Sequence, residues 1–256
     1  MSNYPTEESL EARLVNLTDL AAVAVNPPLE LNADEVHVWL ADLDQPSADN
    51  MRPLLAEDEL ARAERFHFEK DRKHYINARG LLRQLLAVYS GLPAAEVQIK
   101  YAEKGKPHVS ATGINFNLAH SLGKAIYAFA RGRDLGVDLE FMKEDFAVEE
   151  IAERFFSPNE FAVLKELPPQ LTKEAFFNCW TRKEAYIKAR GEGLSMPLDV
   201  FEVSLAPGEP AAFLRNQLDP AELSRWSMQS LSVPDGYVAA LVVEGKGFRV
   251  KRFCLA

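Results

Sequence analysis

Cysteine is scarce in this 256-residue sequence, which contains Cys179 and Cys254 and no others. Two isolated cysteines support neither a disulfide framework nor a cysteine-based metal cluster. The sequence also lacks any run near the ~20 apolar residues that a membrane-spanning helix needs. Its opening residues, MSNYPTEESLEARL, have no basic start followed by an apolar segment and so do not resemble a signal peptide. We therefore expect a cytoplasmic protein that does not enter a membrane.

Positive charge is in deficit, with a net charge of −9 at pH 7. Nucleic acids and anionic membranes attract positively charged surfaces, so we expect neither as a partner. Residues 61–83 reverse the trend, because seven basic and three acidic residues give a local net charge of +4 (7 − 3). Such a segment suits a small anionic ligand or an acidic partner surface, and a solvated helix face fits the charge equally well.

The sequence contains 47% hydrophobic residues and 26% charged residues, as globular proteins do. Hydrophobic periodicity, with glycine and proline as terminators, predicts both helices and strands after a polar N-terminal arm over residues 1–34. The predicted helices cover about residues 57–66, 71–89, 149–166 and 173–190. The predicted strands lie in residues 35–43, 97–109, 124–142, 236–245 and 248–256, with turns at Gly105 and Gly132.

One short segment occurs twice, as YINARG at 75–80 and as YIKARG at 186–191, 111 residues apart (186 − 75). A second pair, LLAEDE at 54–59 and FFSPNE at 155–160, is 101 residues apart (155 − 54), and an insertion such as ELPPQLTK absorbs the difference. Two similar halves, 35–131 and 132–256, explain both pairs. Coincidence remains the alternative because the repeats are short.

The segment GVDLE contains two carboxylates on one face of a predicted strand, Asp138 and Glu140. Side chains two residues apart on a strand are separated by about 7 Å, which lets both serve one divalent ion such as Mg²⁺. Downstream, Glu184 and Lys188 are one helical turn apart. They form either a surface ion pair or a third carboxylate and a cation for a phosphate. Spacing alone does not choose.

Polar side chains also gather in INFNLAHSLGK, where Asn117, His120 and Ser121 lie at an expected break before a strand. Lys104 and Lys106 flank a glycine shortly before this segment. Backbone donors and cations of this kind can converge on an anion. A structural role for the histidine is the alternative.

Together, these motifs resemble the 4′-phosphopantetheinyl transferases of the Sfp type. The similarity covers about residues 35–205 and rests on motifs that follow one another in the family's order. They are FNLAHS (116–121), GVDLE (136–140), FFSPNE (155–160) and WTRKEAYIKARGEGL (180–194), preceded by the basic segment RFHFEKDRKHYINARGLLR (65–83). One departure is Ala119, which replaces the hydroxyl residue that often precedes the histidine.

The resemblance implies an α+β fold, a pseudo-dimer of two similar α+β halves with the active site at their interface. It implies transfer of the 4′-phosphopantetheine group of coenzyme A to a serine of an apo acyl or peptidyl carrier protein, with release of 3′,5′-ADP. Carrier proteins of fatty acid, polyketide and nonribosomal peptide synthesis are all possible partners. We expect a Mg²⁺-dependent monomer, with Mn²⁺ as a possible substitute.

The resemblance also assigns roles to individual residues. Asp138, Glu140 and Glu184 are the expected metal ligands, and Lys188 is the expected phosphate-binding lysine. The first half is expected to bind the outer phosphates of the nucleotide, and the second to hold the metal and the catalytic groups, Glu184 and Lys188. The expected coenzyme A contacts are Arg62, Arg79, Arg83, Lys106, Asn117, His120 and Lys188.

Two points stay open at this stage. The serine proton can pass to Glu184 or to a metal-bound hydroxide, and the sequence does not choose. The alternatives to carrier-protein priming are a non-catalytic coenzyme-A-binding protein of the same fold and another Mg²⁺-dependent phosphotransferase or hydrolase.

Overall fold

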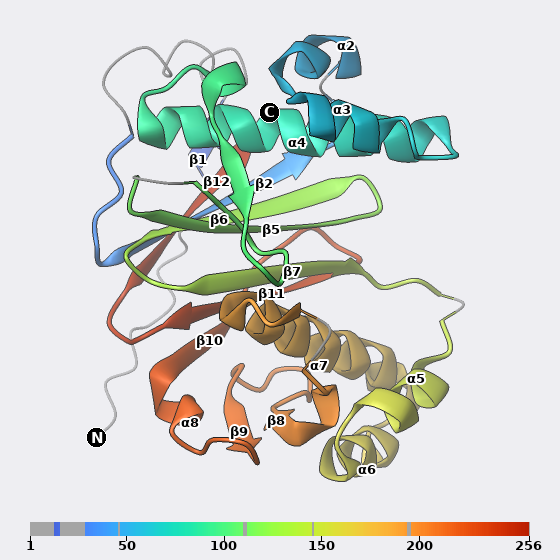
Figure 1. The fold of residues 1–256 in the computed structure, drawn as a ribbon. Coiled ribbons are helices and arrows are strands. Elements are labelled where there is room, and N and C mark those ends of the chain that lie inside the picture. Colours follow the sequence, from blue (N-terminus) through green and yellow to red (C-terminus); the bar gives the residue numbers. More distant parts are fainter. Residues whose placement is uncertain are drawn as a thin grey trace. The chain divides into compact units, whose positions relative to one another are not determined.

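The computed structural model describes residues 13–15, 29–45, 47–109, 112–144, 146–193 and 196–255. The chain forms two compact units, one of residues 1–97 and 248–256 and the other of residues 98–247. Both contain helices and strands, which confirms the predicted α+β class (Figure 1). No helix in these ranges is long and apolar enough to cross a membrane. The predicted arm over residues 1–34 lies mostly outside the described residues.

Parallel strands form the sheet of the first unit. Strand β12 (Arg249–Leu255) pairs in parallel with β2 (Glu35–Asp42) on one side and with β1 (Arg13–Val15) on the other. We expected β2 from its alternating pattern, yet every residue from Glu35 to Trp39 is buried. A parallel sheet is normally covered on both faces, which explains the loss of alternation in burial.

Helix α4 (Glu69–Ser90) is the long helix of this unit, and it starts two residues before the predicted position. It ends at Gly91, whose φ of 72° is the left-handed conformation that glycine adopts freely. Gly80 lies within α4, and a Cβ there would approach the Met51 Cβ to 2.7 Å. Glycine therefore lets α2 approach α4 (Figure 1). The short helices nearby are α2 (Ala48–Met51), η1 (Arg52–Leu54), α3 (Glu57–Ala63) and η2 (Ala94–Glu96).

A buried carboxylate on β2 gives a first testable prediction. Glu35 accepts a hydrogen bond from the Lys251 Nζ at 2.8 Å, and this bond is the main cause that lowers its pKa from 4.5 to about 2. A carboxylate with a lowered folded pKa stabilises the protein above its unfolded pKa, and this stabilisation is lost as the pH falls to the folded value. We expect Glu35→Gln to lower the free energy of unfolding at pH 7 by about 1–2 kcal/mol, since Lys251 is half-exposed.

Urea unfolding of both proteins between pH 7 and pH 2 measures this effect. The difference between wild type and Glu35→Gln should begin to shrink near pH 4.5 and vanish near pH 2. A difference that is independent of pH would show that ionisation of Glu35 contributes nothing.

A three-stranded antiparallel sheet and one long helix organise the second unit. The sheet has the order β10 (Trp226–Ser230), β11 (Tyr237–Glu244), β7 (Leu135–Phe141). Helix α7 (Pro169–Arg190) packs along β7 and β11 (Figure 1). Gly136 on β7 makes this packing close, because a Cβ at that position would lie 2.1 Å from the Ala185 carbonyl oxygen of α7.

Two hairpins also belong to this unit. Strand β5 (Ile114–Ser121) pairs with β6 (Lys124–Arg131), and both strands contact β7. Strands β3 (Ile99–Tyr101) and β4 (Pro107–Val109) enclose the predicted turn at Gly105, whose φ is 86°. The remaining elements are η4 (Leu198–Val200), β8 (Phe201–Val203), β9 (Phe213–Asn216) and α8 (Glu222–Arg225).

The single helix predicted over residues 149–166 is wrong, because two helices occupy this region. Helix α5 (Val148–Phe155) ends before Ser157, and α6 (Pro158–Glu166) begins after it. The Glu160 backbone N–H donates to the Ser157 Oγ at 3.2 Å, and the Ser157 N–H donates to the Glu160 carboxylate at 2.9 Å. This capping box, with proline in the first turn, starts a new helix.

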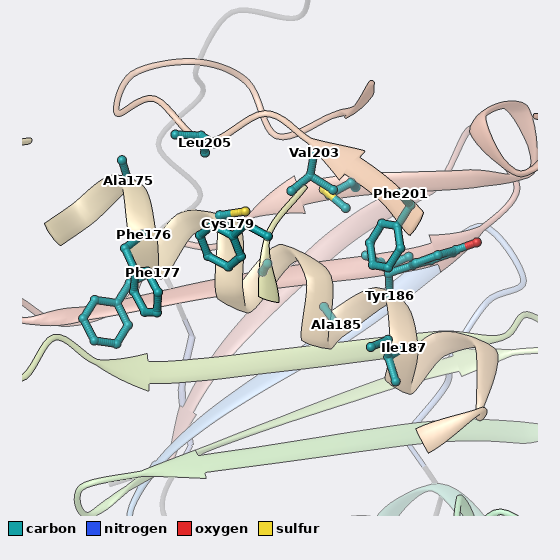
Figure 2. Packing of buried hydrophobic residues seen from close by; sticks show 14 of the residues in the cluster. Ala175, Phe176, Phe177, Cys179, Ala185, Tyr186, Ile187, Phe201, Val203 and Leu205 are labelled. Carbon is teal, nitrogen blue, oxygen red and sulfur yellow. The ribbon is translucent and has the colours of Figure 1, made fainter. Parts of the chain in front are cut away.

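Aromatic side chains fill the core around α7. Phe176 stacks on Phe156 with ring centres 5.2 Å apart. Tyr186 meets Phe201 edge-on with ring centres 4.9 Å apart. Figure 2 shows Phe176, Tyr186 and Phe201 in this core. A charged pair is buried beside this cluster, with the Lys183 Nζ 2.8 Å from the Glu160 carboxylate. The core therefore fixes α7 against β8 and α6.

The compact units differ in extent from the predicted halves 35–131 and 132–256. The second unit already begins at residue 98, because β5 and β6 contact β7, and the last strand, β12, belongs to the first unit. The contacts that define the compact units do not test whether the two halves are similar to each other. The two similar halves and the pseudo-dimer therefore stay a prediction.

Candidate active site

The carboxylates of GVDLE lie on β7, as predicted. Asp138 is 4% exposed, and Glu140, two residues further along the strand, is half-buried. Helix α7 packs on β7 and contributes Glu184 and Lys188, both half-buried. Gly136 permits the close approach that brings these side chains near the strand. The structure therefore brings together the four residues that sequence reasoning chose for the metal and the phosphates.

Lys188 and Asp138 form an ion pair. The Lys188 Nζ lies 2.6 Å from the Asp138 Oδ1 and also donates to the Val137 carbonyl oxygen at 3.4 Å. The other oxygen of the same carboxylate, Oδ2, is buried and has no hydrogen-bond partner in the described part of the chain. A buried carboxylate oxygen without a partner is costly, so this atom favours a further cation or donor.

Mutual repulsion adds to burial at the other two carboxylates. Burial raises the pKa of Glu184, and the negative charges of Asp138 and Glu140 raise it further against the opposing effect of Lys188. Burial also raises the pKa of Glu140, with Asp138 as the second cause. Three carboxylates thus share one electrostatic environment, and a cation among them would relieve the repulsion.

The side chains are not arranged as a finished metal site. Within the described ranges, no three or more histidine, cysteine, aspartate or glutamate side chains are grouped closely enough to hold an ion. The Lys188 ammonium contacts Asp138 and supplies the local positive charge. The donor set is nevertheless the hard-oxygen type that Mg²⁺ prefers.

Strand β5 contributes a further polar side chain that sequence reasoning left without a role. The Ser121 Oγ donates to the Glu140 carboxylate at 2.9 Å and accepts from the Phe141 N–H at 3.1 Å. The sequence signal was its place beside His120 in FNLAHS. Ser121 orients one of the candidate metal ligands.

The predicted break at Asn117, His120 and Ser121 is wrong, because all three lie on β5. Polar residues obscured the strand pattern, and two of them, Asn117 and Ser121, form hydrogen bonds with β7. The Asn117 Oδ1 accepts a hydrogen bond from the Val137 N–H at 2.9 Å. Asn117 is buried and joins two strands, whereas His120 is exposed on the same strand.

Lys106 lies at the end of α7, shortly after the turn at Gly105. Its Nζ donates to the Ala189 carbonyl oxygen at 2.7 Å and lies 3.3 Å from the Asp134 carboxylate. Burial lowers the pKa of Lys106 against the opposing effect of Asp134. A cation at a helix C-terminus satisfies a free carbonyl and opposes the helix dipole.

The three candidate arginines, all in the first unit, differ in environment. The Arg79 Nε lies 2.8 Å from Glu59, and the Arg83 Nε lies 2.6 Å from the same carboxylate. Both side chains are buried, and this ion-pair network joins α3 to α4. Arg62 is exposed, with its guanidinium 5.7 Å from the centre of the Tyr75 ring. That these arginines bind coenzyme A stays a prediction.

Comparison with known protein families is decisive. Residues 45–129 match the profile of the 4′-phosphopantetheinyl transferase N-terminal family, and residues 134–242 match that of the 4′-phosphopantetheinyl transferase superfamily. The 4′-phosphopantetheinyl transferase HetI of Nostoc sp. (strain PCC 7120) is 39% identical over 231 residues, which cover 88% of this chain and 94% of that protein. The chain belongs to the 4′-phosphopantetheinyl transferase superfamily.

Relatives of the Sfp type confirm the predicted resemblance. A 4′-phosphopantetheinyl transferase of Bacillus subtilis is 34% identical over 61% of this chain and 69% of its own length. The 4′-phosphopantetheinyl transferase Sfp of Bacillus subtilis (strain 168) is 29% identical over 64% of this chain and 72% of its own. The protein is thus a phosphopantetheinyl transferase, and its family acts on apo carrier proteins with coenzyme A as substrate.

Proposed function

We propose that this phosphopantetheinyl transferase moves the 4′-phosphopantetheine group of coenzyme A to a serine of an apo carrier protein, releases 3′,5′-ADP and requires Mg²⁺. The supporting observation is the Asp138 carboxylate, with Lys188 on one oxygen and no described partner at the other, buried oxygen. Glu140 and Glu184 share its electrostatic environment, as the raised pKa of each carboxyl shows. An arrangement that disfavours its own negative charge suits a cationic cofactor.

Asp138, Glu140 and Glu184 are the proposed ligands of this ion. Their oxygens fit Mg²⁺, or Mn²⁺ in its place, better than a metal that prefers nitrogen or sulfur. The bound ion would neutralise charge on the pyrophosphate of coenzyme A. Ser121 would hold the Glu140 carboxylate in its orientation through their 2.9 Å hydrogen bond.

The reaction is a substitution at phosphorus. The serine oxygen forms a bond to the β-phosphorus, the bond from that phosphorus to the bridging oxygen breaks, and 3′,5′-ADP leaves with the electron pair. Positioning and charge stabilisation supply most of the catalysis in such transfers. The Lys188 ammonium is the proposed positive charge for the transferred phosphate, and Glu184 is the proposed acceptor of the serine proton.

Mass spectrometry tests this function directly. The enzyme is incubated with coenzyme A, Mg²⁺ and either an apo acyl carrier protein or an apo peptidyl carrier domain. Each carrier molecule should gain one phosphopantetheine group, one 3′,5′-ADP should appear for each group, and EDTA should stop the reaction. Formation of 3′,5′-ADP without a modified carrier protein would indicate a hydrolase instead. Coenzyme A binding with no product would indicate a non-catalytic protein.

A second prediction concerns the 3′-phosphate of coenzyme A. Of the three candidate arginines, Arg62 alone is exposed, and we expect Arg62→Ala to weaken binding of coenzyme A about tenfold more than binding of 3′-dephospho-coenzyme A. Arg79→Ala should also lower the free energy of unfolding, because it leaves the buried Glu59 carboxylate with one ion-pair partner fewer. Isothermal titration with both ligands measures the first effect, and urea unfolding measures the second.

If Arg62→Ala weakens the binding of coenzyme A and of 3′-dephospho-coenzyme A equally, Arg62 does not contact the 3′-phosphate.

The remaining proposed contacts to coenzyme A are Arg83, Lys106, Asn117, His120 and Lys188. The same titration should give one coenzyme A per chain, and a solution mass measured alongside should be that of a monomer. Two sites per chain would contradict the proposal.

A further inference from the structure

The turn between β5 and β6 has an unusual residue in a strained position. Ser121 pairs with Lys124, so Leu122 and Gly123 alone form the turn, with φ of 39° and 82°. Two-residue hairpin turns with positive φ at both positions strongly prefer asparagine, aspartate or glycine. In the part of the chain that the structure describes, no other non-glycine residue has a positive φ. A leucine here therefore calls for an explanation.

Exposure makes the leucine still less expected. Its side chain is 56% exposed, so it contributes little to the core in return for the backbone strain. Hydrogen bonds nevertheless tie the turn to the end of β7 and the start of β11. The Tyr237 Oη donates to the Leu122 carbonyl oxygen at 2.6 Å, and the Phe141 N–H donates to the Ser121 Oγ at 3.1 Å. The fold thus holds an exposed apolar side chain in a defined place.

That place adjoins the candidate active site. Leu122 directly follows Ser121, whose Oγ donates to the Glu140 carboxylate at 2.9 Å. The acceptor serine is part of a carrier protein. When this serine reacts near Glu140, the carrier protein must cover the enzyme surface around it. An exposed leucine beside the reacting groups would lose water contact in that encounter. A few central residues commonly supply most of the binding energy of such interfaces.

We propose that Leu122 is a docking contact for the apo carrier protein, and that this partner presents an apolar side chain beside its acceptor serine. The inference rests on the proposed function, because it takes the carrier protein as the macromolecular substrate. The fixed turn reduces the entropy lost on binding, since little of the chain has to be ordered.

Two substitutions separate the side chain from the backbone strain. Leu122→Gly and Leu122→Asn both tolerate positive φ and both remove the apolar surface. Each should raise the KM for the apo carrier protein about three- to tenfold and leave the KM for coenzyme A unchanged. The Tm of the glycine variant should be unchanged or higher by up to about 4 °C, because the strain is relieved. Leu122→Phe retains an apolar side chain and should keep the carrier KM within about twofold of wild type.

Leu218→Ser is the matched control, since Leu218 is 64% exposed and lies after β9 in the same unit. Its carrier KM should equal that of wild type. The proposal is overturned if the Gly and Asn variants keep the wild-type carrier KM, if the control raises it equally, or if the coenzyme A KM rises instead. If the wild type modifies neither an apo acyl carrier protein nor an apo peptidyl carrier domain, the proposed function itself fails.

Discussion

Asp138→Ala and Glu184→Ala should each reduce phosphopantetheine transfer by at least about 10³-fold while the protein remains folded. Each substitution removes one proposed ligand of the same ion. Asp138→Ala also frees Lys188 from its 2.6 Å ion pair, so the ammonium loses its position beside the carboxylates. The Lys188 side chain is 27% exposed and can be solvated, which keeps the cost in stability small. Initial rates of carrier modification, measured by mass spectrometry at saturating Mg²⁺, provide the test.

A matched control is Glu153→Ala, which removes an exposed carboxylate from α5 in the same unit and should leave the rate unchanged. Circular dichroism and Tm report whether each variant is folded. If either active-site variant transfers phosphopantetheine near the wild-type rate, the substituted carboxylate is not required for catalysis. Unfolding would instead show that the carboxylate serves the core.

The largest expected loss of stability comes from the buried pair of Glu160 and Lys183. Lys183 is fully buried, and its Nζ also donates to the Leu198 carbonyl oxygen at 2.7 Å. The Glu160 carboxylate accepts from the Val203 N–H at 2.8 Å and so ties α6 to β8. Glu160→Ala leaves a buried ammonium without its counter-charge, which typically costs about 3–5 kcal/mol. We expect the Tm to fall by about 10 °C or more.

Differential scanning calorimetry of Glu160→Ala, Lys183→Met and the double variant measures the coupling between the two residues. The double variant should lose less than the sum of the single losses, because no unpaired charge remains in the core. Arg154→Ala is the control, since it removes an exposed charge from neighbouring α5 and should change the Tm by less than about 2 °C. Additive losses in the double variant would show that the charges do not stabilise one another.

The repeated hexapeptide, whose two copies differ at one position, shows how much a short sequence repeat can predict. Both copies lie on helices of 22 residues, α4 and α7, as the periodicity predicts. Gly191 of the second copy ends its helix, whereas Gly80 of the first lies inside α4 and allows Met51 to approach. The local sequence predicts the helix, whereas the element packed against it determines the structural role of each glycine.

The coenzyme A candidates show the same limit. Arg79 and Arg83 are cations of a basic segment in the sequence, but in the fold both contact Glu59, which comes from α3. Lys106 likewise contacts the end of α7, 83 residues away in the chain. Charge counting cannot foresee such partners, because the partner is set by which elements pack together.

The sequence by itself determined the family, the α+β class and most of the long helices and strands, because these depend on local periodicity, terminators and ordered motifs. It also pointed to Asp138, Glu140, Glu184 and Lys188, because their spacing places each pair on one face and because the resemblance to the family assigns their roles. Only the tertiary structure decided that Lys188 pairs with Asp138, that Ser121 holds Glu140 and that Leu122 is strained beside them. The first two contacts join residues of β5, β7 and α7, and long-range packing sets their geometry.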